Sequence, residues 1–174
     1  PEEDFNKING FAQGIDKRAL NERKGVIRET TCEIEQMIVR DLYIDRYDWH
    51  LRVFYAVDCN DTRYVIHELK AIRCTRENLE RAYRNLSSCR LNTGLTFSNK
   101  DSRESVMIIG KWTSPAEFDN SFSHELRHFT DHVAKAFGME IGGEEVAYLS
   151  GEIRRELFPV NKMFFVPVVI TITR

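Results

Sequence analysis

Alternating apolar and polar positions mark the first clear element of the chain. Apolar side chains fill every second position from Trp49 to Val57, which is the period of a strand with one buried face. Two further apolar runs, at 95–98 and 106–112, flank the polar stretch 99–103, whose residues favour a turn. The pattern predicts a strand at 49–57 followed later by a β-hairpin.

Helical spacing appears between the predicted strand and the hairpin. Apolar residues recur at intervals of three and four over 64–73 and again over 75–86, and Thr75 is placed to cap the second of these helices. A weaker pattern of the same kind over 27–42 also predicts a helix. A pair of helices is therefore expected to connect the strand to the hairpin.

The longest predicted helix covers 115–137. Ser114 can serve as its N-cap, Pro115 suits the first helical position, and Gly138 suits the C-cap. A second helix is predicted from Glu144 onward. One apolar stripe of the long helix is expected to face the core; it consists of Phe118, Phe122, Leu126, Phe129, Val133 and Phe137.

The long helix carries the sequence His124-Glu125-Leu126-Arg127-His128, an H-E-x-x-H motif. The i, i+4 spacing places both imidazoles on one side of the helix, roughly opposite the apolar stripe. Two imidazole nitrogens can bind Zn²⁺ at about 2.0–2.1 Å, and Glu125 can take the proton of a water whose pKa the metal lowers to about 7. The motif predicts a zinc site, and the competing interpretation is an exposed polar helix face.

A third ligand is expected from the next helix. Glu144 is the first choice, because it points away from the apolar side of that helix, and Glu145 on the flank is the second. The long helix continues about nine residues past His128, or roughly 14 Å, so a tight antiparallel return would instead bring Glu152 level with the histidines. The three carboxylates remain alternatives.

Two more residues of the long helix bear on the metal. His132 lies a further turn along, but three imidazoles in one straight row cannot close around a single ion, because the outer two are rooted roughly 12 Å apart. His132 is therefore predicted to lie outside the ligand set. Asp131 is a candidate to orient a ligating imidazole by accepting its other N–H.

The H-E-x-x-H segment, followed by Glu-Glu-Val-Ala-Tyr-Leu-Ser-Gly at 144–151, resembles the gluzincin plan. It also resembles a group of small uncharacterised phage and prophage proteins of gut Bacteroidales, over about residues 49–160. More distantly, the helical core is similar to that of repressor-cleaving metallopeptidases of mobile elements. The spacing between His128 and Glu144 is shorter than in thermolysin-like enzymes, which leaves the third ligand open.

These resemblances imply both a fold and a set of roles. The implied fold is zincin-like α+β, with a small mixed or antiparallel sheet packed on helices. The implied zinc ligands are His124, His128 and Glu144, with Glu125 as general base and Tyr148 as a stabiliser of the oxyanion. The implied substrate is a peptide or protein. The alternative is a non-catalytic zincin-fold module of a phage or mobile element, with a binding or structural role.

Composition narrows the class of protein further. At 174 residues the chain fits one domain, assigned to 21–174, after a polar and loosely ordered arm at 1–20. A formal net charge of -2 gives no electrostatic basis for binding nucleic acid. The apolar run at 163–172 is too short for a membrane span and is expected to form an edge strand or a packed tail.

Cysteine usage bears on the compartment. The four cysteines include no C-x-x-C pair and are expected to be ordinary thiols. No signal peptide is recognisable, and a cytoplasmic setting is expected.

Overall fold

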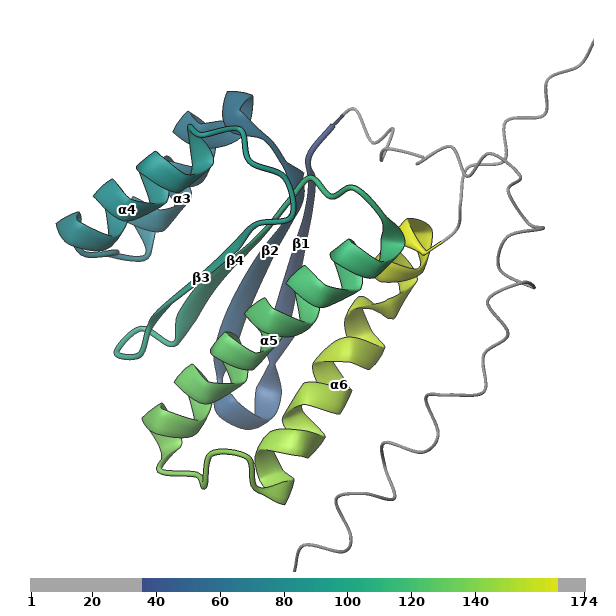
Figure 1. The fold of residues 1–174 in the computed structure, drawn as a ribbon. Coiled ribbons are helices and arrows are strands. Elements are labelled where there is room, and N and C mark those ends of the chain that lie inside the picture. The colour runs from purple at the N-terminus through teal and green to yellow at the C-terminus, as the bar shows by residue number, and fades with distance from the viewer. Residues whose placement is uncertain (1–35, 166–174) are drawn as a thin grey trace, which may run out of the picture.

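A four-stranded mixed sheet forms the centre of the protein (Figure 1). The computed structural model describes residues 36–165. The strands are β1 (Ile38–Ile44), β2 (Trp49–Val57), β3 (Gly94–Asn99) and β4 (Glu104–Gly110), in the spatial order β1-β2-β4-β3. β2 and β4 run parallel, whereas the two outer pairs are antiparallel. The expected α+β class is confirmed.

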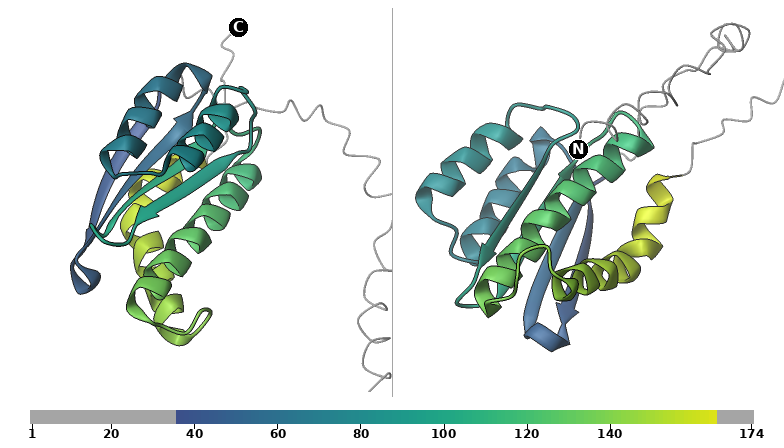
Figure 2. Two further views of the ribbon diagram at one scale, coloured as in Figure 1. Left: turned by 90° about the vertical axis from the view of Figure 1, so that its left-hand side faces the viewer. Right: turned by 60° about the horizontal axis from the view of Figure 1, so that its bottom comes forward.

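Two pairs of helices cover the two faces of the sheet (Figures 1 and 2). α3 (Thr62–Ala71) and α4 (Arg76–Leu86) lie on one face. α5 (Pro115–Phe137) and α6 (Glu144–Asn161) lie side by side on the other. Short 3-10 turns occur at Asp45–Tyr47, Cys59–Asp61 and Lys162–Phe164.

The alternation along β2 divides the core into two layers. Trp49, Leu51 and Val53 pack under α5 and α6, whereas Phe54 packs under α3 and α4. Val57 shares the face of Phe54 because the register of β2 against β4 shifts between these two residues. Because a strand directs successive side chains to opposite faces, one buried central strand supplies both layers. The strand, the hairpin and the two connecting helices predicted from the sequence are confirmed.

The predicted long helix and its ends are also confirmed. Ser114 Oγ accepts a hydrogen bond from the backbone N–H of Glu117 at 3.2 Å. Gly138 ends the helix in the left-handed conformation, with φ of 67°, where a glycine has no Cβ to strain. The helix that follows begins at Glu144, as predicted. Most of the apolar stripe is buried against the sheet: Phe118, Phe122, Leu126, Phe129 and Val133.

The helix predicted over 27–42 is wrong where the structure describes it. Residues 38–44 form β1, which pairs antiparallel with β2 from Ile38↔Tyr55 to Ile44↔Trp49. The spacing of the apolar residues is compatible with a helix, but as a strand along β2 the segment packs Ile38, Leu42 and Ile44 against the core layer under α5 and α6. The arm at 1–20, and the part of the apolar C-terminal run beyond 165, lie outside the described residues.

The expectation of ordinary thiols is also wrong for two cysteines. Cys59 and Cys89 form a disulfide that joins the end of β2 to the segment after α4. Their Cα atoms lie 4.9 Å apart, within the range that a disulfide spans. Cys74 is a buried free thiol. None of the helices within 36–165 has the length and apolarity that a membrane-crossing helix needs.

Candidate active site

The edge strand β3 supplies one wall of the site. Its alternate residues Gly94, Thr96 and Ser98 are small or polar and lie on the side of α5, as the contacts of Glu125 and His132 show. The intervening Leu95 and Phe97 pack into the core layer under α3 and α4. This division lets the H-E-x-x-H segment of α5 approach the strand closely.

The two motif histidines converge on one point. The Nε2 atoms of His124 and His128 lie 3.0 Å apart, and their rings meet edge to face with centroids 4.6 Å apart. Two nitrogens bound tetrahedrally to one zinc ion at 2.0–2.1 Å are about 3.3 Å apart. Both side chains are exposed, so the pair fits two ligands of one ion that solvent can reach.

Glu125 is buried beside this pair. Its residue exposure is 4%, and its Oε2 accepts a hydrogen bond of 2.7 Å from the Thr96 hydroxyl. Burial raises the pKa of the Glu125 carboxyl above its ordinary value, and the Thr96 bond together with positive charge on His128 and His124 opposes that rise. Its Oε1 accepts no hydrogen bond from any residue within 36–165.

Gly94 provides the space that Glu125 occupies. A Cβ at position 94 would lie 2.5 Å from both Cγ and Oε1 of Glu125, and 2.8 Å from Cδ. Carbon atoms in contact are normally about 3.5–4.0 Å apart. The missing side chain of Gly94 is therefore what allows the carboxylate to lie against the strand.

A chain of hydrogen bonds connects β2, β4 and β3 to His132 of α5. The Trp49 indole N–H donates to Ser105 Oγ at 2.8 Å, and Ser105 bonds Ser98 at 2.6 Å. Ser98 in turn bonds Nδ1 of His132 at 2.9 Å. Burial lowers the pKa of His132, which favours its neutral form. His132 therefore ties α5 to the sheet.

The neighbouring carboxylate, Asp131, has a different partner from the one predicted. It pairs with Arg127 at 2.9 Å, one turn back along α5. The hydrogen bond expected from a ligating imidazole is not made by Asp131 in the structure.

The structure does not bring the predicted third ligand to the histidines. Among residues 36–165, no third Cys, His, Asp or Glu joins His124 and His128 in a group able to hold a metal. α6 packs along the side of α5 that carries Ser123, whose hydroxyl accepts a 2.6 Å bond from Arg154. The histidines project on the other side of α5, toward β3 and its adjoining cavity.

The candidate ligands on α6 have other surroundings. Glu145 pairs with Arg46 at 2.6 Å and accepts a bond from Tyr47 at 3.2 Å. Glu152 lies 3.9 Å from Arg155, and Glu144 is exposed in the first turn of the helix.

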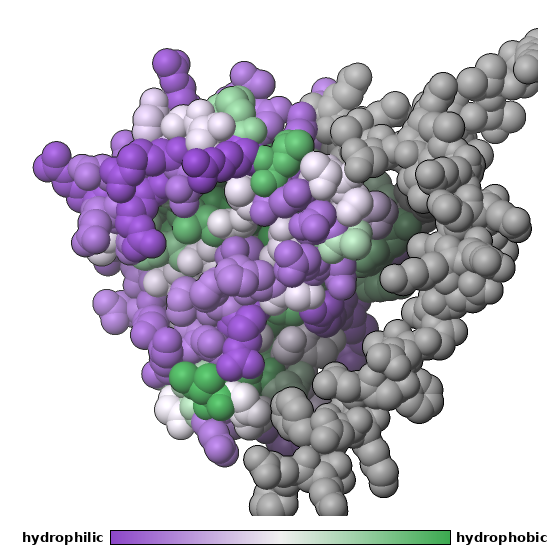
Figure 3. All heavy atoms as spheres, in the orientation of Figure 1, coloured by the Kyte–Doolittle hydropathy of each residue, from purple (hydrophilic) through white to green (hydrophobic). Residues whose placement is uncertain are grey.

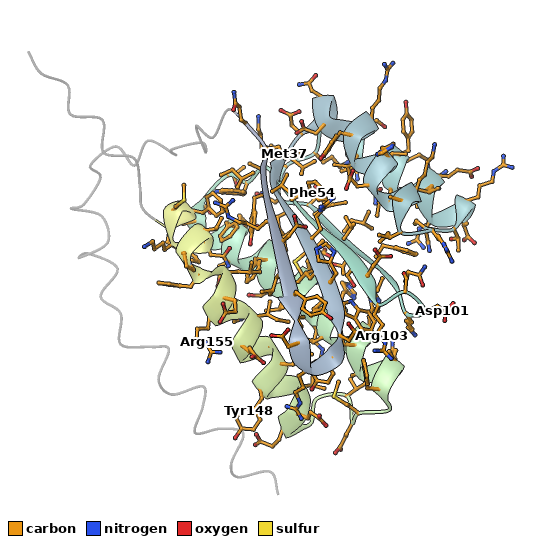
Figure 4. All side chains as sticks on the ribbon, turned by 180° about the vertical axis from the view of Figure 1, so that it is seen from behind. Met37, Phe54, Asp101, Arg103, Tyr148 and Arg155 are labelled. Atoms are coloured by element: carbon orange, nitrogen blue, oxygen red, sulfur yellow. A yellow bond between two sulfur atoms is a disulfide. The ribbon has the colours of Figure 1, made fainter. Side chains whose placement is uncertain are left out.

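Tyr148, the predicted oxyanion stabiliser, is 71% exposed. Figure 4 shows it on the outer side of α6, which is the side turned away from the sheet. Its phenol is not assembled with Glu125 in this arrangement. The prediction of a helix that begins at Glu144 is thus confirmed. The residues of α6 that were predicted to belong to the site do not lie beside the H-E-x-x-H motif in the structure.

A cavity of about 410 Å³ opens beside the motif. Its walls come from the end of α4, the start of β3 and the first half of α5, and both His124 and Glu125 line it. Figure 3 shows hydrophobic residues set back between hydrophilic ones on this face of the molecule. The volume is within the range of pockets that hold small ligands or single side chains.

Sequence reasoning missed Gly94, Thr96 and the cavity wall after α4. The signal for the first two was present, because positions 94, 96 and 98 of the predicted hairpin are small or polar while 95 and 97 are apolar. The cavity wall had no comparable signal.

Comparisons with known proteins find nothing similar: no family model, no curated protein and no solved structure matches this chain. The site therefore has to be interpreted from its own geometry.

Proposed function

We propose that this protein hydrolyses peptide bonds with the help of a zinc ion held by His124 and His128. The observation that carries the proposal is the convergence of the two Nε2 atoms, 3.0 Å apart, beside the buried carboxylate of Glu125. A surface helix without a function has no reason to bury a glutamate beside two exposed histidines. The adjoining cavity and the open strand edge add space for a substrate.

Glu125 is the proposed general base. When bound, zinc supplies Lewis acidity that lowers the pKa of a coordinated water to about 7. Thr96 holds Oε2 of Glu125, which leaves Oε1 to accept the proton of the attacking water and return it to the leaving amine. The raised pKa of the Glu125 carboxyl lies closer to physiological pH than that of an ordinary glutamate, which suits proton transfer.

The edge of β3 is the proposed binding surface for the peptide backbone. β3 is the last strand of the sheet, so one row of its N–H and C=O groups has no neighbouring strand within 36–165. An extended peptide can pair with such an edge by β-addition. Because Gly94 and Thr96 contact Glu125, a peptide added there would run past the general base.

The proposal is tested with the Glu125→Gln variant. Zinc content is expected to stay near that of the wild type, while hydrolysis of a mixed peptide pool falls about 10²–10⁴-fold, the usual contribution of a general base. Glu156→Gln is the matched control, because it removes the same charge from an exposed position of α6. Equal hydrolysis by wild type and Glu125→Gln would refute the role of Glu125.

Zinc content also tests the ligand set. His124→Ala and His128→Ala are each expected to lose the metal. Glu144 remains the proposed third ligand, which requires the start of α6 to move round α5 from the side that carries Ser123 to the side that carries the histidines. Zinc retained at full affinity in Glu144→Gln would remove it from the set.

A second function is compatible with the histidine pair, for which no third protein ligand is found among the described residues. In that case the chain is a non-catalytic module, and metal at the histidines contributes to stability alone. Chelation would then lower the melting temperature of the protein, and the wild type would hydrolyse no peptide.

A further inference from the structure

The cavity beside the motif has a charge character that the hydrolytic chemistry does not require. Arg90 is the only permanent cation among its lining residues within 36–165. Among the lining residues that the structure describes, the only acidic one is Glu125, which is buried and bonded to Thr96. Arg90 is exposed, and no acidic partner is found for it among the described residues. An unpaired guanidinium at a cavity is suited to a planar anion.

Uncharged polar groups line the same cavity as Arg90. The side-chain amides of Asn85 and Asn120 line the same cavity from α4 and α5, and within 36–165 neither makes a side-chain hydrogen bond. Ser121 adds a hydroxyl group, whereas the Ser88 hydroxyl already donates to the backbone carbonyl of Asn85 at 2.6 Å. Amides and hydroxyls can donate to a carboxylate while the guanidinium supplies the charge.

The segment that carries Arg90 is fixed at both ends. The disulfide of the preceding residue, Cys89, joins it to Cys59 at the end of β2. On the other side, the backbone N–H of Asn92 donates to the carbonyl of Lys111 at 2.8 Å. The Asn92 side chain also exchanges hydrogen bonds with Thr113, at 2.9 and 3.0 Å. A cationic group on a fixed segment loses less entropy when it binds a ligand.

We propose that this cavity binds a carboxylate of the substrate, with Arg90 as its charged partner and as a determinant of specificity. The inference rests on the proposed peptidase function, because His124 and Glu125 line the same cavity. The carboxylate has two possible sources, an acidic side chain next to the cleaved bond or the C-terminus of the peptide. Both present the same planar anion to the guanidinium.

The binding test uses four capped amino acids as probes, titrated into zinc-loaded, ¹⁵N-labelled Glu125→Gln protein and followed by NMR. N-acetyl-glutamate-methylamide offers only a side-chain carboxylate, and N-acetyl-alanine only a terminal one. N-acetyl-glutamine-methylamide is the neutral control and N-acetyl-lysine-methylamide the cationic one. At least one carboxylate probe is expected to bind about tenfold more tightly than both controls, and the stronger of the two identifies the source.

Variants at position 90 complete the test. In the Glu125→Gln background, Arg90→Gln is expected to remove the preference, and Arg90→Glu to reverse it toward the lysine probe. Arg84→Gln is the matched control, because Arg84 is exposed on α4 and lines a different hollow. Equal binding of all four probes, binding of none, or a preference that survives Arg90→Gln would overturn the inference.

Hydrolysis separates this inference from the proposed function. Zinc-loaded wild type is given peptides that differ only in glutamate, glutamine or lysine at each position in turn. If no peptide is cleaved but the carboxylate probes bind through Arg90, the peptidase proposal fails and the anion site stands. If peptides are cleaved without preference for a carboxylate, and the probes bind equally, the peptidase proposal stands and the anion site fails.

Discussion

Gly94→Ala is a small change with a large expected effect on Glu125. The added Cβ would lie 2.5 Å from Cγ and Oε1 of Glu125, which is about 1.0–1.5 Å closer than ordinary contact. The strand is held by β4 on one side and the helix by its buried stripe, so the Glu125 side chain has to move. A displacement of about 1 Å at a reacting group can cost about 10²-fold in rate.

Two measurements follow from this geometry. Peptide hydrolysis (kcat/KM) by Gly94→Ala is expected to fall about 100-fold, with zinc content unchanged because the histidines are not touched. Overpacking is expected to cost about 1–3 kcal/mol in the free energy of unfolding, or roughly 2–12 °C in melting temperature for a chain of this size. Gly151→Ala is the matched control, because its added Cβ meets nothing within 4 Å beyond its chain neighbours and the backbone of its own helix.

A double-mutant cycle isolates the contact between the two residues. Glu125→Ala removes Cγ, Cδ and Oε1. In that background Gly94→Ala is therefore expected to lower the free energy of unfolding by at least about 1 kcal/mol less than it does in the wild type. Chemical denaturation of the four proteins gives the coupling energy. If Gly94→Ala costs the same free energy with and without the Glu125 side chain, or leaves hydrolysis unchanged, the close approach does not govern the site and the reasoning is refuted.

Two further predictions concern the body of the protein. Reducing the Cys59–Cys89 bond, which closes a loop with a sequence separation of 30, is expected to lower the free energy of unfolding by about 3–4 kcal/mol; equal denaturation midpoints with and without reductant would contradict this. The Lys111 ammonium, 2.8 Å from Asp58, lowers the pKa of that carboxyl. The pair therefore stabilises the fold at pH values above the ordinary pKa of Asp, and this stabilisation is lost as the pH falls through the lowered pKa. Asp58→Asn is therefore expected to destabilise the protein by up to about 1 kcal/mol at pH 6, with the difference shrinking by pH 3; a difference that grows toward acid would have the wrong sign.

The sequence predicted those parts of the fold that depend on local pattern. The long helix has a continuous stripe from Phe118 to Val133 with capping residues at both ends, and these signals act within a few turns. The motif histidines follow from the same periodicity, since residues four apart on a helix are neighbours. Their convergence was therefore predictable once the helix was.

The parts that sequence reasoning missed depend on distant partners. The apolar residues within 38–42 have a spacing that is compatible with a helix, and the segment forms a strand because it pairs with β2. The disulfide likewise depends on the segment after α4 folding back to the end of β2. Neither contact has a signature within its own segment, because strand pairing and disulfide connectivity are non-local.

The side of α5 on which α6 packs is a further non-local choice. Leu149, Ile153 and Leu157 of α6 are buried in the core layer shared with β1 and β2, while β3 occupies the other side of α5. The connection between the helices is compatible with either side as far as its length is concerned. Whether a carboxylate of α6 can reach the histidines depends on that side, so the length of the chain alone does not predict the third ligand.

The burial of Glu125 favours a functional site over a chance motif on a solvated helix. Placing a carboxylate at 4% exposure with one hydroxyl donor costs free energy, because a buried charge is stable only when well paired. If the position had no functional role, an alanine or a leucine there would give a more stable protein. Instead, β3 carries a glycine where the carboxylate lies and a threonine where it needs a donor. Two residues of a distant strand thus accommodate a destabilising group next to the histidine pair, an arrangement typical of sites at which stability is exchanged for chemistry.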